Sequence, residues 1–233
     1  MTNTNSTQVS FVKEQNKFLT RTYGWMTLAL IISGLAAFFT ASYITSAGES
    51  ALLFLSKGIF ILGFAEIILV WWLSASISKI KVSSAVFAFI VYSILNGVTL
   101  SSIFLFYAGS SIISIFITSA LMFGLMALYG TFTKQNILSF GRYFFMALIG
   151  LLIASILNFI LRNGTLDWII SVVTVVLFTG LSAYDAQKML RVSEHATDSD
   201  VFKKASIIGA LELYLDFINI FLSLLRLFGK RSD

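Results

Sequence analysis

Seven long apolar segments, separated by polar links, dominate the pattern of the chain. Each is close to the about 20 apolar residues that an α-helix needs to cross the hydrocarbon core of a bilayer. Strands of a membrane β-barrel would be about ten residues long and would alternate in polarity, unlike these segments. The pattern predicts an all-α integral membrane protein whose seven transmembrane helices are Tyr23–Ile44, Leu52–Leu73, Ser83–Tyr107, Ser111–Tyr129, Tyr143–Leu161, Asp167–Ala186 and Ala205–Leu227.

The polar ends of the chain set the expected domain limits. Residues 1–22 form a polar tail and residues 230–233 a short basic one, so we expect a single membrane domain over residues 23–229. The first apolar segment is too long for a cleavable signal sequence, and we expect it to be retained as a span. Among the links, only Gln187–Lys204 is both long and strongly charged.

Composition supports the membrane assignment and excludes several chemistries. Of 233 residues, 58% are apolar and only 12% are charged, whereas soluble domains carry about 25% charged residues. The chain has no cysteine, which excludes disulfides and thiolate sites, and its one histidine, His195, cannot form a histidine metal cluster. The net charge of +5 favours binding to anionic lipid at the cytoplasmic surface over binding to nucleic acid.

Lysine and arginine predict the orientation of the spans. The N-terminal tail and the second, fourth and sixth links would share one side of the membrane, and they hold most of the basic residues. Because basic links stay in the cytoplasm, we expect a cytoplasmic N-terminus. These residues are Lys13, Lys17, Arg21, Lys79, Lys81, Lys134, Arg142, Lys188, Arg191, Lys203 and Lys204.

Two aspartates within apolar segments are the main candidates for function. Asp185 lies near the end of the sixth segment and Asp216 in the middle of the seventh. A carboxylate at membrane depth costs several kcal/mol unless it faces a partner, a cavity or water. If the two carboxyl groups meet, they would share a proton and titrate as a coupled pair. The two aspartates therefore predict a proton switch between neighbouring helices.

The seventh segment carries its polar residues on one face. At about 100° per residue, Glu212, Asp216, Asn219, Ser223 and Arg226 fall within one narrow stripe. Such a stripe cannot face lipid, so we expect the helix to lie inside the bundle. Glu212, Asn219 and Ser223, together with Ser182 of the sixth segment, are candidate pore-lining residues. Glu66 is a third buried acid, and it needs either a partner such as Arg226 or a proton.

The chain resembles the Bax inhibitor-1 family, also called the transmembrane Bax inhibitor motif family, and its bacterial members in particular. The resemblance is specific over Gly209–Gly229 and at Tyr184-Asp185-Ala186-Gln187, and weaker at Asn96-Gly97-Val98-Thr99-Leu100. It implies two groups of three helices around a central C-terminal helix. It also implies a pH-sensitive aspartate pair, Asp185 and Asp216, that gates a calcium leak. Glu66 and Arg226 would then act as a latch.

Alternatives to the leak remain open at this stage. Some bacterial members of that family restrain a membrane protease, so a non-conducting regulator of another membrane protein is one alternative. A proton-coupled transporter is another. Paired aspartates also occur in intramembrane proteases, but this chain lacks their Gly-x-Gly element before Asp216, and a chain without proline cannot hold their Pro-Ala-Leu element. We therefore expect no enzyme and no cofactor, with calcium contacted weakly and transiently by Asp185 and Asp216.

Overall fold

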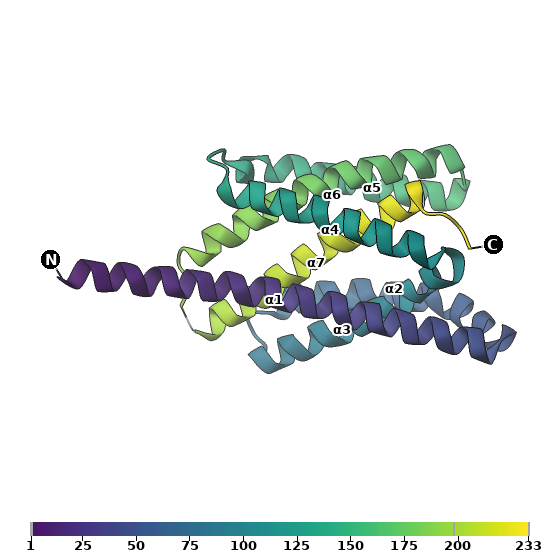
Figure 1. The fold of residues 1–233 in the computed structure, drawn as a ribbon, viewed down its shortest axis with the longest axis horizontal. Coiled ribbons are helices and arrows are strands. Elements are labelled where there is room, and N and C mark those ends of the chain that lie inside the picture. Colours follow the sequence, from purple (N-terminus) through teal and green to yellow (C-terminus); the bar gives the residue numbers. More distant parts are fainter. Residues whose placement is uncertain (1, 198, 233) are drawn as a thin grey trace. The chain divides into compact units, whose positions relative to one another are not determined.

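The computed structural model describes residues 2–197 and 199–232. For residues 2–11 and 49–57 it describes the backbone only. Within the described residues lie seven long helices and no β-strand, which confirms the predicted all-α class (Figure 1). The elements are α1 (Thr2–Ala47), α2 (Glu49–Ser76), α3 (Val82–Phe106), α4 (Gly109–Phe132), the short 3₁₀ helix η1 (Ile137–Phe140), α5 (Gly141–Leu161), α6 (Gly164–Ser193) and α7 (Asp200–Phe228). All seven long helices are long and apolar enough to cross a membrane.

The chain divides into two compact units, and α7 contributes to both. The first unit comprises Met1–Tyr107, His195–Tyr214 and Ser232, and so contains α1, α2, α3 and the first half of α7. The second comprises Ala108–Glu194 and Leu215–Arg231, with α4, α5, α6 and the second half of α7. The expected groups of three helices are therefore α1–α3 and α4–α6.

Small residues let α1 and α3 pack closely in the first unit. One face of α1 carries four buried small side chains at intervals of four residues: Ala29, Ser33, Ala37 and Ala41. On α3, Gly97 meets this face so tightly that a Cβ there would lie 2.5 Å from the Ser33 carbonyl oxygen. Close backbone contact at small residues is a common way for helices to associate in lipid. The helix α2 packs mainly on α3.

In the second unit, a glycine likewise lets α4 and α6 pack closely. A Cβ on Gly130 of α4 would overlap the carbonyl group of Ala183 on α6. The helix α5 also packs on α6. There the Phe144 ring of α5 meets the Tyr184 ring of α6 edge-on, with 5.6 Å between ring centroids. The position of α6 is therefore set by a glycine contact with α4 and an aromatic contact with α5.

Burial differs strongly between the helices. No residue of the α5 span is buried, and few of the α2 span are, so these two helices present apolar side chains outward, as expected toward lipid. The α7 span is 72% buried, the highest share of the seven. This confirms that the last helix lies inside the protein. Its burial extends beyond the polar stripe, because Leu213, Ile220 and Leu225 are also fully enclosed.

Three helix boundaries differ clearly from the sequence-based expectation. The polar residues before Tyr23 continue α1, which begins at Thr2. The predicted link Gln187–Lys204 is mostly helical, since α6 runs to Ser193 and α7 starts at Asp200. The reason is that hydropathy marks where a helix leaves the hydrocarbon core, whereas the helix itself ends where its backbone bonding stops. At 30 residues, α6 is longer than the core requires.

We expect Gly130→Ala to destabilise the protein and Gly124→Ala, on the same helix, to leave it unchanged or slightly more stable. The first substitution forces a methyl group into the Ala183 backbone, whereas nothing lies within 4 Å of a Cβ at Gly124. Overpacking costs about 1–3 kcal/mol, and alanine is favoured over glycine in helices by about 0.5–1 kcal/mol. Thermal unfolding of both variants in detergent checks this. Equal melting temperatures would contradict the contact.

Candidate functional site

The two predicted aspartates are both buried and both belong to the second unit. Asp185 on α6 is 8% exposed and Asp216 on α7 is 3% exposed. Burying a carboxylate costs free energy that must be offset by hydrogen bonds, a counter-charge or a bound proton. Both aspartates are therefore buried, as the predicted proton switch requires. The direct pairing of their carboxyl groups stays a prediction.

Residues on both sides of Asp185 fix its helix in place. Two positions earlier, Ala183 meets Gly130. Two positions later, the amide of Gln187 anchors the segment between α4 and α5. Its Oε1 accepts hydrogen bonds from the backbone N–H groups of Ile137 (2.8 Å) and Leu138 (3.3 Å), and its Nε2 donates to the Gln135 carbonyl oxygen (2.8 Å). The sequence marked Gln187 only as part of a motif, and this anchoring role was missed.

Aromatic side chains fix the part of α7 that carries Asp216. The adjacent Phe217 packs edge-on against Phe116 and Phe123 of α4, with ring centroids 5.2 Å and 6.0 Å apart. One turn later, Phe221 also contacts Phe116, at 5.9 Å. Edge-to-face contacts of this kind favour one relative rotation of two helices. Asp216 is thus held on a helix whose rotation is defined.

The other residues of the predicted polar stripe differ in burial. Ser223 is fully enclosed, as is Ser182 on α6, whose hydroxyl donates to the Phe178 carbonyl oxygen at 2.8 Å. Glu212 and Asn219 are half-buried. The Asn219 amide donates one of its two hydrogens to the Leu215 carbonyl oxygen of its own helix (2.8 Å). These four residues remain candidates for lining a pore.

Arg226, at the end of the stripe, is partly exposed and lies beside Asp167. Its Nη1 is 4.0 Å from Asp167 Oδ1, with both side chains about half exposed, and its Nη2 is 3.5 Å from the Ser223 hydroxyl. An exposed ion pair of this length contributes about 0–1 kcal/mol.

Glu66 is buried in the first unit and bonds to neutral side chains. It is 9% exposed. Asn96 Nδ2 donates to its Oε2 at 2.9 Å, and the Thr99 hydroxyl donates to its Oε1 at 2.5 Å. Both partners come from the Asn96–Leu100 motif, where a spacing of three residues puts them on one face of α3. That spacing was the signal that could have identified them. The latch formed by Glu66 and Arg226 stays a prediction.

The contacts of Glu66 extend into a hydrogen-bonded chain across four helices. The Tyr214 hydroxyl of α7 lies 2.7 Å from Asn96 Oδ1 and 2.7 Å from the Ser33 hydroxyl of α1. Ser33 in turn donates to the Ser93 carbonyl oxygen at 2.7 Å. We call Ser33, Glu66, Ser93, Asn96, Thr99 and Tyr214 the Glu66 network. All six belong to the first unit.

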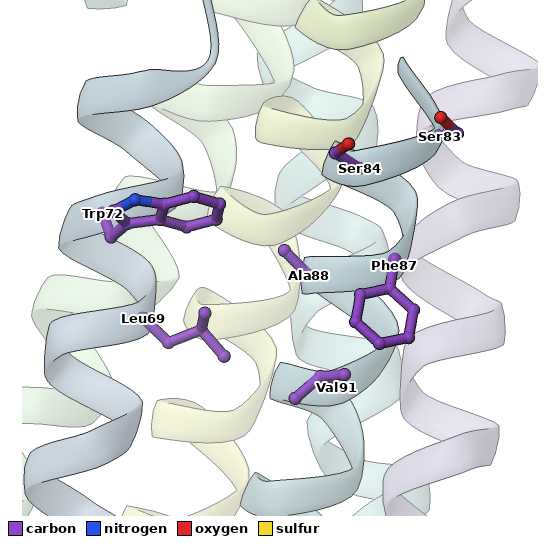
Figure 2. Close-up of a pocket in the computed structure, with 7 residues that line it drawn as sticks. All are labelled: Leu69, Trp72, Ser83, Ser84, Phe87, Ala88 and Val91. Atoms are coloured by element: carbon purple, nitrogen blue, oxygen red, sulfur yellow. The ribbon is translucent and has the colours of Figure 1, made fainter. Parts of the chain in front are cut away.

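A groove on the outer surface between α2 and α3 is separate from these polar sites. Figure 2 shows its seven lining residues, Leu69, Trp72, Ser83, Ser84, Phe87, Ala88 and Val91. Trp72 and Phe87 are 42% and 69% exposed, so the groove opens on the apolar outer face. In the described part of the chain, no three acidic or histidine side chains come together as a metal site.

Seven apolar helices with acidic side chains enclosed between them define a polytopic membrane protein with buried titratable groups. The model of the family described as "Inhibitor of apoptosis-promoting Bax1" matches residues 15–233. Inner membrane protein YbhL of Escherichia coli strain K12 is 44% identical over 218 residues, which cover 92% of each chain. A protein of Borreliella burgdorferi is 37% identical over 94% of each chain. The chain therefore belongs to the Bax inhibitor-1 family.

We expect Gln187→Leu to destabilise the segment that Gln187 anchors. The change leaves the Leu138 N–H group without its side-chain partner, and the Ile137 N–H and Gln135 carbonyl groups keep only their bond to each other at 3.1 Å. An unsatisfied buried group costs about 1–3 kcal/mol. Limited proteolysis between Thr133 and Phe140 should become faster. Gln135→Ala is the matched control, because it removes an exposed side chain and keeps the backbone carbonyl. Equal cleavage rates in the two variants would rule out the anchoring role.

Proposed function

We propose that this protein is a pH-sensitive cation leak that passes calcium and is gated by Asp185 and Asp216. The observation that carries the proposal is the enclosure of two acids on consecutive membrane helices, in one unit of a Bax inhibitor-1 family protein. Burying a carboxyl group in a membrane span costs free energy, and such residues are therefore rare unless they have a functional role.

The proposed gate works through a shared proton. With one proton between the two carboxyl groups, they form a hydrogen bond and carry a single negative charge. Loss of that proton leaves two like charges in a region of low dielectric constant, and their repulsion drives α6 and α7 apart. Water and cations then enter between the helices. The protonated pair is the closed state and the ionised pair the open state.

Calcium suits the oxygen atoms that this region offers. It is a hard ion that takes carboxylate, carbonyl and water oxygens. Asp185 and Asp216 would contact it only weakly, and Glu212, Asn219, Ser223 and Ser182 would line its path. A permeant ion must leave as well as enter, so sites with few ligands suit a leak.

We place the protein in the bacterial inner membrane with its N-terminus in the cytoplasm. The relative from Escherichia coli is named an inner membrane protein, and the basic residues of this chain favour the cytoplasm for its N-terminal tail and even-numbered links. Its partners are then the lipid bilayer, protons and calcium. We expect no catalytic activity from the aspartate pair.

Asp216→Asn is expected to abolish the pH dependence of calcium flux into liposomes that contain the purified protein. Asparagine keeps the shape of the side chain but cannot lose a proton between acidic and neutral pH. Asp200→Asn is the matched control, because Asp200 lies on the same helix with its side chain 77% exposed, and its flux profile should match the parent protein. Flux would be measured with a trapped calcium indicator over a series of pH values.

An unchanged pH profile in Asp216→Asn would contradict the gate. Parent protein that conducts no ion but co-purifies with a membrane protease would favour the non-conducting regulator. Saturable exchange of an organic solute would favour the proton-coupled transporter.

The absence of cysteine from the chain allows a direct test of orientation with single cysteines. We expect Thr197→Cys, in the link between α6 and α7, to react with a membrane-impermeant maleimide only after the membrane is opened. Thr165→Cys, at the opposite end of α6, should react in intact spheroplasts. Both positions are exposed in the structure. The reverse pattern would overturn the assignment of the N-terminus to the cytoplasm.

A further inference from the structure

When Glu66 is ionised, the Glu66 network has one donor hydrogen fewer than it has hydrogen-bonding contacts. In that state the Asn96 amide must donate to Glu66, so its oxygen faces Tyr214 and takes the single tyrosine proton. Ser33 then has one proton for two acceptors, the Tyr214 oxygen and the Ser93 carbonyl oxygen. One of the contacts beyond Asn96 therefore lacks a hydrogen.

A proton on Glu66 removes this deficit. The two ends of an amide have nearly the same shape, so Asn96 can turn over in place and exchange its oxygen and nitrogen. Glu66 then donates to the Asn96 oxygen, and the Asn96 nitrogen donates to Tyr214. Tyr214 donates to Ser33, and Ser33 donates to the Ser93 carbonyl oxygen. Every contact from Glu66 to Ser93 now holds one hydrogen.

Among the described residues, Glu66 forms no ion pair. Its recorded hydrogen bonds, among the described residues, are those with Asn96 and Thr99. The titratable groups that interact with it are Tyr92 of α3 and Tyr214 of α7, and α1 has no titratable side chain between Tyr23 and Tyr43. An ionised carboxylate enclosed by neutral groups is costly, whereas a protonated one is a neutral donor.

We propose that Glu66 is a second proton-binding site, in the first unit, and that a proton bound there turns the Asn96 amide and reverses the hydrogen bonds of Tyr214. The site is distinct from the aspartate pair, which lies in the second unit, and it stands whether or not that pair gates an ion path.

The proton on Glu66 also strengthens the contact between α1 and α3. In the protonated state the Ser33 proton goes to the Ser93 carbonyl oxygen alone, because Tyr214 now donates to Ser33. This bond crosses the two helices next to Gly97, where their backbones meet most closely. In the ionised state the same proton is divided between two acceptors, and the link is weaker. Proton binding at Glu66 is thereby coupled to helix packing on another face of α3.

Infrared difference spectroscopy between acidic and alkaline pH tests this on the full chain in lipid nanodiscs. The background is Asp185→Asn with Asp216→Asn, so neither aspartate contributes. We expect a carboxylic acid C=O band that disappears at alkaline pH and is absent after Glu66→Gln. The same spectrum should contain a shift of the tyrosine C–O band, lost in Tyr214→Phe. Tyr92→Phe is the matched control and keeps it, because Tyr92 packs against Tyr214 at 5.9 Å between ring centroids but lies outside the network.

Two results would overturn the proposal. One is a set of carboxylic acid bands that Glu66→Gln leaves unchanged. The other is a Glu66 band without a tyrosine shift that Tyr214→Phe removes, since proton binding would then not reach Tyr214. If the double background variant does not fold, subtracting the Glu66→Gln spectrum from that of the parent protein isolates the same bands. Loss of calcium flux in the aspartate variants would test only the proposed gate at Asp185 and Asp216, and not the proton-binding site at Glu66.

Discussion

The structure depends on one constraint, which is that polar groups enclosed by lipid-facing helices must find their partners inside the protein. The contact at Gly97 meets this constraint in the first unit. Because Gly97 has no side chain, α1 approaches closely enough for the Ser33 hydroxyl to reach both Ser93 and Tyr214. A bulkier residue at Gly97 would separate the helices and leave these polar groups enclosed without partners.

Each unit combines a glycine contact with one polar side chain that bonds to several groups. In the first unit the glycine is Gly97 and the polar side chain is Glu66. In the second the glycine is Gly130, and Gln187 binds the segment between α4 and α5. Apolar burial is a weak driving force for helices surrounded by lipid, so backbone proximity and hydrogen bonds carry more of the specificity.

The chemistry of the sequence predicted the spans and the enclosed acids, but not the hydrogen bonds of Glu66 to Asn96 and Thr99. Long apolar runs identified all seven helices, and the cost of a charge in lipid identified Glu66, Asp185 and Asp216 as buried. Partners such as Asn96 and Thr99 were missed because small neutral side chains on a membrane helix also occur as packing residues. The helical parts of the sixth link were missed because hydropathy does not report backbone bonding beyond the bilayer.

The helix α7 passes from one unit to the other between Tyr214 and Leu215. At about 100° per residue, Tyr214 and Asp216 point to nearly opposite sides of it. No glycine or proline interrupts the helix between Gly209 and its end at Phe228, so it is stiff over this stretch. One unbroken helix therefore carries both the buried Tyr214 hydroxyl and the buried Asp216 carboxyl group, so a substitution that breaks α7 near its middle would disturb both polar environments together.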